Sequence, residues 1–129
     1  SGDLAKKKTY PSLLHLFAAN LLPNDTQIWG YARSKITHEE LRAKIRPFIE
    51  KSGDASVIDA FLSQCFYKQG KSYGDQKAYQ ELATEMSHYE MQFSNKLNHN
   101  RLFYFAIPPN VFAEAGVAIK KSAMADKGW

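Results

Sequence analysis

The sequence predicts an α/β fold with a mostly parallel sheet, on three observations. Short runs rich in β-branched and aromatic residues at 27–32, 65–67 and 102–107 predict strands. The segments between them carry apolar residues at three- and four-residue steps, which predicts helices with one buried face. Strands that alternate with helices are typical of βαβ units joined by right-handed crossovers. We therefore predict one compact domain over residues 1–129.

Helical stripes predict one helix before the first strand, one before the second strand and one after the second strand. Residues 4–22 carry one apolar stripe, and Pro11 predicts a kink or two shorter pieces because proline lacks a backbone donor. The turn-favouring residues at 21–25 predict its end. Another helix is expected to begin near Asp54, and a third to run up to about Glu90.

Two helix starts have a capping signal. Thr37 and Glu40 have the spacing of a capping box, which predicts a helix from His38 to about Arg46. Asn110 is expected to cap the last helix.

The strongest strand signal is the continuous apolar run at 102–107, which ends at Pro108 and Pro109. Such a run is typical of a parallel strand covered on both faces. We therefore expect this strand to be buried.

Composition excludes several classes of protein. A hydrophobic content of 44% with 13% aromatic residues argues against disorder. The single Cys65 cannot form an internal disulfide, so a reducing compartment is favoured and the cytosol is expected. The longest apolar stretch, 13–22, is too short for a membrane helix. The four histidines are scattered, so we expect no metal site.

Two features point to a dinucleotide. Ser1 to Ala5 fit the second half of a glycine turn that brings a pyrophosphate to a helix N-terminus. Arg33 and Ser34 directly follow the second expected strand, where an arginine accommodates the 2′-phosphate of NADP and an acidic residue would favour NAD. Taken singly, Gly2 is also compatible with an ordinary loop and Arg33 with a solvated position after a strand.

Four blocks in the same order and at similar spacing resemble the glucose-6-phosphate dehydrogenase family. They are residues 1–8 (SGDLAKKK), 21–23 (LLP), 30–34 (GYARS) and 100–104 (NRLFY), followed by Pro108 and Pro109. The resemblance covers essentially the whole chain. It implies a Rossmann-like doubly wound parallel sheet and an enzyme that oxidises glucose 6-phosphate to a lactone with reduction of NADP.

The resemblance also implies the coenzyme-binding residues. The coenzyme turn would consist of Ser1, Gly2, Asp3, Leu4, Ala5 and Lys6. Arg33 would bind the 2′-phosphate, and Ala106, Ile107 and Pro108 would line the nicotinamide side, with Tyr67 as a weaker contact. Phe112 stands where the family commonly has a tyrosine, which removes a hydroxyl from that position.

Much of the family's site has no counterpart in this sequence. The strand before the glycine turn, a Glu-Lys-Pro motif, the histidine base and the C-terminal catalytic α+β domain are expected to lie outside residues 1–129. Glucose 6-phosphate would bind to that missing half, and the parent protein is expected to be a homo-oligomer. We expect residues 1–129 alone to be unfolded, aggregated or paired through open strand edges.

Two alternatives stay open on the sequence. One is a non-enzymatic NADP-sensing or interaction module that keeps the fold without the chemistry. The other is a basic nucleic-acid binder, given the net charge of +4, although no nucleic-acid motif supports it and we expect neither nucleic acid nor membrane as a partner.

Overall fold

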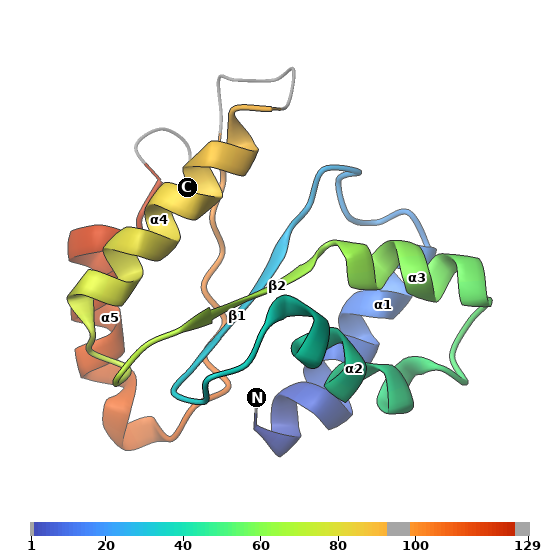
Figure 1. Cartoon of the computed structure of the whole chain (residues 1–129), viewed down its shortest axis with the longest axis horizontal. Helices are drawn as coiled ribbons and strands as arrows, with labels where there is room; N and C mark the ends of the chain where they lie inside the picture. Colours follow the sequence, from blue (N-terminus) through green and yellow to red (C-terminus); the bar gives the residue numbers. More distant parts are fainter. Residues whose placement is uncertain (1, 93–98, 126–129) are drawn as a thin grey trace. The chain divides into compact units, whose positions relative to one another are not determined.

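The computed structural model describes residues 2–92 and 99–125, and the chain divides into two compact units, 1–69 and 70–129 (Figure 1). The first unit contains, in chain order, η1 (Ala5–Thr9), α1 (Tyr10–Ala18), β1 (Ile28–Ala32), α2 (His38–Ile49), α3 (Ala55–Ser63) and β2 (Cys65–Gln69). The second contains α4 (Gln76–Glu90), η2 (Pro109–Val111) and α5 (Phe112–Ser122). Strands joined through helices confirm the predicted α/β class.

The first predicted helix forms as two pieces, as Pro11 indicated. Residues 5–9 make a π-helical turn, and the α-helix begins at Tyr10 with Pro11 in its first turn. Proline is tolerated there because the first backbone N–H groups of a helix have no intrahelical acceptor.

The end of α1 is set by Asn20, earlier than the predicted stop at 21–25. Asn20 adopts a left-handed conformation with φ of 56°, which asparagine tolerates better than most residues. Its N–H donates to the Phe17 carbonyl at 3.1 Å, and the Leu21 N–H donates to the Leu16 carbonyl at 2.9 Å. This pair of bonds is a Schellman motif, which satisfies the last carbonyls of the helix.

The two strands pair in parallel over their full lengths, with Ile28 opposite Cys65 and Ala32 opposite Gln69. The predicted strand at 65–67 is therefore confirmed and is longer than expected. The strand predicted at 27–32 is also confirmed; Ala32 is buried and the other four residues of β1 are half-buried.

Helix α2 begins with the predicted capping box. The Thr37 hydroxyl accepts from the Glu40 N–H at 3.1 Å, and the Glu40 carboxylate accepts from the Thr37 N–H at 2.7 Å. The predicted end at about Arg46 is wrong, because the helix continues through Pro47 to Ile49. Burial of the apolar stripe explains the extension, because Ile49 is fully buried at the end of that stripe.

Side chains of α2 also bond to the outer edge of β2. The Tyr67 N–H donates to His38 Nδ1 at 2.9 Å, and Arg42 Nε donates to the Cys65 carbonyl at 3.0 Å. The Arg42 guanidinium lies 5.5 Å from the ring centre of Phe66.

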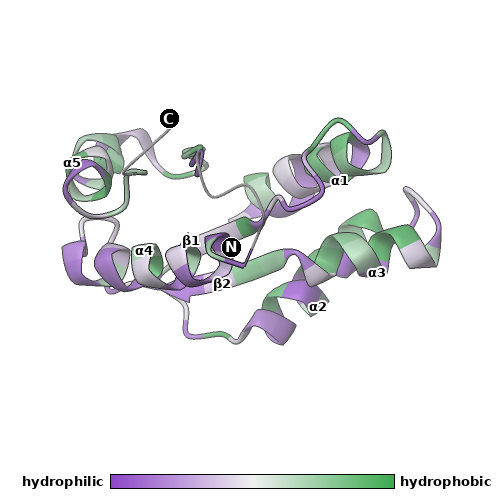
Figure 2. Cartoon of the chain, turned by 90° about the horizontal axis from the view of Figure 1, so that it is seen from above, coloured by the Kyte–Doolittle hydropathy of each residue, from purple (hydrophilic) through white to green (hydrophobic). Residues whose placement is uncertain are grey.

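The core of the first unit lies between α1, α2, α3 and the two strands. Helix α3 is mostly hydrophobic, whereas much of α2 is hydrophilic (Figure 2). The predicted inner face of α3 is confirmed at Ile58, Phe61 and Leu62, while Asp54 is the N-cap residue without a side-chain capping bond. The fully buried members of this core are Leu14, Ile45, Ile49, Phe61 and Cys65.

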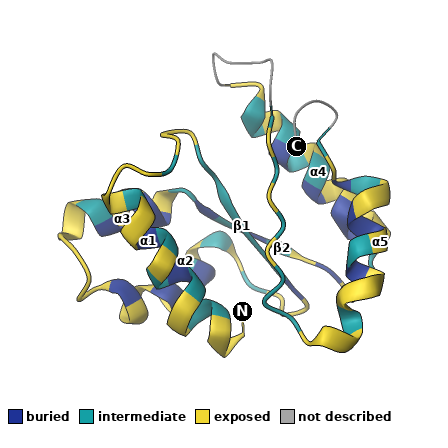
Figure 3. Cartoon of the chain, turned by 180° about the vertical axis from the view of Figure 1, so that it is seen from behind, coloured by how far each residue is buried: buried dark blue, intermediate teal, exposed yellow. Residues whose placement is uncertain are grey.

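In the second unit, α4 and α5 pack against each other, and each has a buried and an exposed side (Figure 3). Arg101 connects the ends of both helices. Its guanidinium donates to Glu90 at 2.8 and 2.7 Å, to the Ser87 hydroxyl at 3.0 Å and to the Ala123 carbonyl at 3.0 Å. Only 10% of the Arg101 side chain and 19% of the Glu90 side chain are exposed.

The prediction of a strand at 102–107 is wrong, because these residues form no strand in the described part of the chain. These residues are extended without strand pairing, and Leu102 and Tyr104 are 81% and 68% exposed. Exposure alternates along residues 102–105, as it does on a strand with one covered face. The apolar run specifies a strand only when a partner strand supplies the hydrogen bonds, and within the described residues this segment has none.

The last helix also begins differently from the prediction. Asn110 lies inside η2 rather than at a cap, and the N-cap residue of α5 is Val111, which makes no side-chain capping bond. The predicted inner face holds at Ala115, Ala118 and Ile119. Within residues 2–92 and 99–125, no helix combines the length and hydropathy of a membrane span.

The Arg101 network predicts a large effect on stability. Arg101→Ala leaves the half-buried Glu90 carboxylate without its partner, and losing hydrogen bonds to a charged group costs about 1.5–3 kcal/mol. Arg46→Ala, which breaks the exposed pair with Asp59, is the matched control and should cost less than about 1 kcal/mol. Urea unfolding of the intact protein measures both values; equal losses would contradict the assignment.

Candidate coenzyme-binding site

The parallel pairing brings two chain segments to the same end of the sheet. Arg33 and Ser34 follow the carboxyl end of β1, and Gln69 ends β2 directly opposite Ala32. Open α/β sheets bind ligands outside the carboxyl ends of their strands. The turn that contains Arg33 therefore lies at the edge of the sheet where such a fold binds its ligand, and the coenzyme contacts of Gly2 and Arg33 stay predictions.

Side chains of β2 hold the turn that contains Arg33. The Tyr67 hydroxyl donates to the Ser34 carbonyl at 2.6 Å, and Gln69 Nε2 donates to the Arg33 carbonyl at 3.1 Å. Arg33 itself is exposed. Tyr67 is only 4% exposed. Its direct contact with coenzyme stays a prediction, whereas its contact with the turn is observed.

The start of the first helix offers backbone donors. The Lys6 N–H donates to the Gly2 carbonyl at 3.2 Å, which is the first such bond of the helix. The N–H groups of Asp3, Leu4 and Ala5 come before it, in the first turn, where backbone donors commonly face solvent or a ligand. A side chain on Gly2 would meet no protein atom within 4 Å. This arrangement suits an anionic group such as a pyrophosphate; Ser1 lies outside the described residues.

The charged side chains of this segment already have contacts. The Asp3 carboxylate lies 3.8 Å from Lys6 Nζ and 3.9 Å from Lys7 Nζ. Lys6 Nζ is also 5.9 Å from the ring centre of Phe48. Lys6 therefore interacts with α2 and with Asp3, and its role toward coenzyme stays a prediction.

The remaining residues predicted for the site belong to the second unit. Ala106 and Ile107 are half-buried, and Pro108 is exposed just before η2. Phe112 is 40% exposed, with its ring centre 5.4 Å from that of Phe105. An aromatic contact thus takes the place of the hydroxyl that the resemblance would put at Phe112.

The titratable side chains of Tyr10 and Cys65 are buried in the first unit. Gly30 allows the Tyr10 hydroxyl to approach, because a methyl group there would lie 2.9 Å from that oxygen. Burial raises the pKa of Tyr10 well above its usual range, and burial also raises the pKa of the Cys65 thiol to about 12. The Cys65 sulfur is 3.5 Å from the Phe61 carbonyl. Neither group is a reactive acid or nucleophile near neutral pH.

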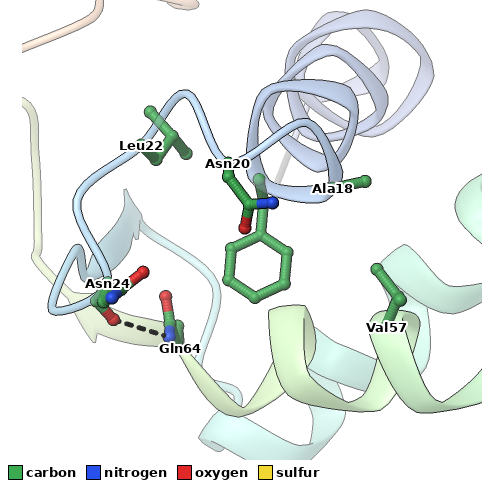
Figure 4. Close-up of a pocket in the computed structure, with 7 residues that line it drawn as sticks. Ala18, Asn20, Leu22, Asn24, Val57 and Gln64 are labelled. Atoms are coloured by element: carbon green, nitrogen blue, oxygen red, sulfur yellow. Dashed lines mark hydrogen bonds between the residues drawn. The ribbon is translucent and has the colours of Figure 1, made fainter.

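A cavity lies at the opposite end of the sheet. Figure 4 shows its lining from the end of α1, the following loop and the start of α3, with Asn20, Asn24 and Gln64 beside the apolar Leu22 and Val57. Gln64 Nε2 donates to the Asn24 carbonyl at 3.2 Å. Because Gln64 directly precedes β2, this cavity is at the amino end of the strands and is not the coenzyme site.

Comparison with known proteins identifies the family. The family model described as "Glucose-6-phosphate dehydrogenase, NAD binding domain" matches residues 1–129. The chain belongs to the glucose-6-phosphate dehydrogenase family. It therefore has the Rossmann-like fold of a coenzyme-binding domain of that family, which confirms the resemblance found in the sequence.

Relatives in sequence and structure lead to the same family. The chain is 40% identical to the chloroplastic glucose-6-phosphate 1-dehydrogenase 1 of Arabidopsis thaliana and 42% identical to the glucose-6-phosphate 1-dehydrogenase of Ceratitis capitata, covering 100% of this chain and 22% and 24% of those proteins. A solved glucose-6-phosphate dehydrogenase in complex with glucose 6-phosphate matches with a TM-score of 0.88 and 36% identity, over 98% of this chain and 26% of that one. The chain thus spans about a quarter of the length of these family members.

Sequence reasoning missed Gln69. It lies just past the strand predicted at 65–67, and its contact with Arg33 spans 36 residues. The parallel register was the signal that could have identified it, because the residue opposite the end of one strand reaches the turn that follows it.

The burial of Cys65 predicts an inert thiol. With a pKa of about 12 in the folded protein, it should not react with a maleimide at pH 7.5 until the protein is unfolded. The raised pKa also means that stability is fully present below the ordinary pKa near 9.0 and falls as the pH rises toward 12. Thiol labelling followed by mass spectrometry tests the first expectation; rapid labelling of folded protein would contradict the buried placement.

Proposed function

We propose that this chain is the coenzyme-binding part of an enzyme that oxidises glucose 6-phosphate to 6-phosphogluconolactone with reduction of NADP. The observation that carries the proposal is Arg33 in the turn after β1, at the carboxyl end of the paired strands. Arginine offers a permanently charged, planar fork that bonds phosphate in a bidentate manner.

The residues of the first unit fit a dinucleotide phosphate. First-turn N–H groups of Asp3, Leu4 and Ala5 suit the pyrophosphate, and the absence of a described protein atom within 4 Å of a Cβ on Gly2 lets a ligand approach the backbone closely. Arg33 suits the 2′-phosphate of NADP, and the position after β1 has no carboxylate for the ribose hydroxyls of NAD.

In this proposal, the chain binds and orients the coenzyme and supplies no proton transfer. When bound, the nicotinamide ring accepts a hydride from carbon 1 of the sugar. Ala106, Ile107 and Pro108 would cover the nicotinamide side with apolar surface, which excludes water from the reacting carbon. Glucose 6-phosphate and the base that takes its proton would be held by a part of the protein beyond these 129 residues.

The relatives support an enzyme over the alternative of a non-enzymatic NADP-sensing module, since each relative reported above is named a dehydrogenase. A homo-oligomeric parent protein is part of the proposal. A cytosolic location, expected from the single cysteine, is also proposed and is tested by fractionating cells.

Arg33→Ala tests the coenzyme assignment. In the full-length protein it should raise the KM for NADP roughly 10- to 100-fold, because hydrogen bonds to charged groups contribute about 1.5–3 kcal/mol. The KM for NAD, which lacks the 2′-phosphate, should change much less. Lys51→Ala removes an equal exposed charge from the loop after α2, and it should leave both KM values unchanged. Equal effects of Arg33→Ala on both coenzymes would sink the assignment.

Gly2→Val tests the glycine turn. A Cβ on Gly2 meets no described protein atom within 4 Å, so folding should be preserved, while crowding of the pyrophosphate weakens NADP binding about tenfold or more. Gly30→Ala is the opposite control, because its methyl group would press on the Tyr10 hydroxyl and lower the melting temperature. Calorimetric titration and thermal unfolding of the full-length variants separate the two effects. If Gly2→Val binds NADP as tightly as the unchanged protein, Gly2 is not part of the coenzyme site.

A further inference from the structure

We propose that Gln69 is a positioning residue for the discrimination of NADP from NAD. Its side chain fixes the turn that presents Arg33, without touching the coenzyme itself. The inference rests on the proposed role of Arg33 and extends it to a second residue, 36 positions away in the sequence.

The contact follows from the strand register. Gln69 lies opposite Ala32, the last residue of β1, so its side chain extends past the end of that strand and donates to the Arg33 carbonyl at 3.1 Å. Tyr67 lies two residues earlier on the same face of β2 and donates to the Ser34 carbonyl at 2.6 Å. Two successive carbonyls of the turn are thus bonded to one strand.

Bonding both carbonyls restricts the backbone where the arginine begins. The Arg33 carbonyl belongs to the peptide plane directly after the Arg33 Cα, so the Gln69 hydrogen bond limits the ψ angle of Arg33. The Ser34 carbonyl belongs to the next plane, so the Tyr67 hydrogen bond limits the dihedral angles of Ser34. The Arg33 side chain therefore starts from a restricted backbone before a ligand arrives. A bidentate guanidinium–phosphate contact depends on the direction of that side chain, because its two hydrogen bonds must form in one plane.

The two donors differ in what else they support. Tyr67 is 4% exposed and its N–H donates to His38 Nδ1 at 2.9 Å, so changes there also disturb α2 and the core. Gln69 is exposed at the end of β2. Its amide can therefore be removed with little effect on packing, which makes it the residue that tests positioning by itself.

The chemistry predicts selectivity for the phosphate. Loss of the Gln69 donor frees the Arg33 carbonyl and lets the turn sample other conformations, which costs binding only when the arginine has a phosphate to hold. NAD carries no 2′-phosphate, so its binding does not depend on the direction of Arg33.

The test compares Gln69→Leu with Gln64→Leu in the full-length protein. Both variants remove an amide that donates to a loop carbonyl, but Gln64 bonds to Asn24 at the amino end of the strands. Gln69→Leu should raise the KM for NADP on the order of three- to tenfold, the effect of losing one hydrogen bond. The KM for NAD and the kcat with either coenzyme should change less than about twofold. The melting temperature should change by no more than a few degrees. Gln64→Leu should leave both KM values unchanged.

A double variant decides whether Gln69 acts through Arg33. In the Arg33→Ala background, Gln69→Leu should cause no further rise in the KM for NADP. An additive rise would overturn the proposal, and so would equal effects of Gln69→Leu on NADP and NAD. If Arg33→Ala is selective for NADP and Gln69→Leu has no effect, the positioning role is wrong and the proposed function stands. If Arg33→Ala is not selective, the coenzyme assignment itself fails.

Discussion

The parallel pairing of β1 with β2 is the constraint on which the candidate site depends. Parallel strands that start together at Ile28 and Cys65 also end together, at Ala32 and Gln69. The turn after β1 is therefore next to side chains from the end of β2 and receives two hydrogen bonds from them. An antiparallel pair would have separated the Arg33 turn from Gln69 by the length of the sheet.

The same pairing leaves β2 with an outer edge, and α2 covers part of it. Alternate residues of a strand direct their backbone groups to opposite sides, and Cys65 and Tyr67 direct theirs away from β1. The Cys65 carbonyl accepts from Arg42, and the Tyr67 N–H donates to His38. Side-chain bonds of this kind occupy groups that would otherwise pair with another strand. The helix that follows the Arg33 turn thus stabilises the strand that holds this turn.

Local signals in the sequence predicted those elements that local interactions stabilise. The capping box at Thr37 forms because its partner is only three residues away, and the stripes of α3 and α4 are buried as their periodicity indicates. The end of α1 depends on a left-handed Asn20, a conformation that many asparagines do not adopt. The segment 102–107 has the composition of a buried strand, but a strand requires hydrogen bonds from a distant segment, and composition does not provide them.

The candidate site likewise contains residues that local sequence signals predict and one residue that depends on a distant contact. Gly2 and Arg33 were predictable because each follows or begins an element with a recognisable boundary, and ligand chemistry restricts the residue types there. The contact of Gln69 could not be predicted from the sequence, because its amide donates to a backbone carbonyl and any residue can supply that acceptor. The sequence therefore predicts which residues meet a ligand, whereas the register between the strands determines which side chains bond to the turn that carries Arg33.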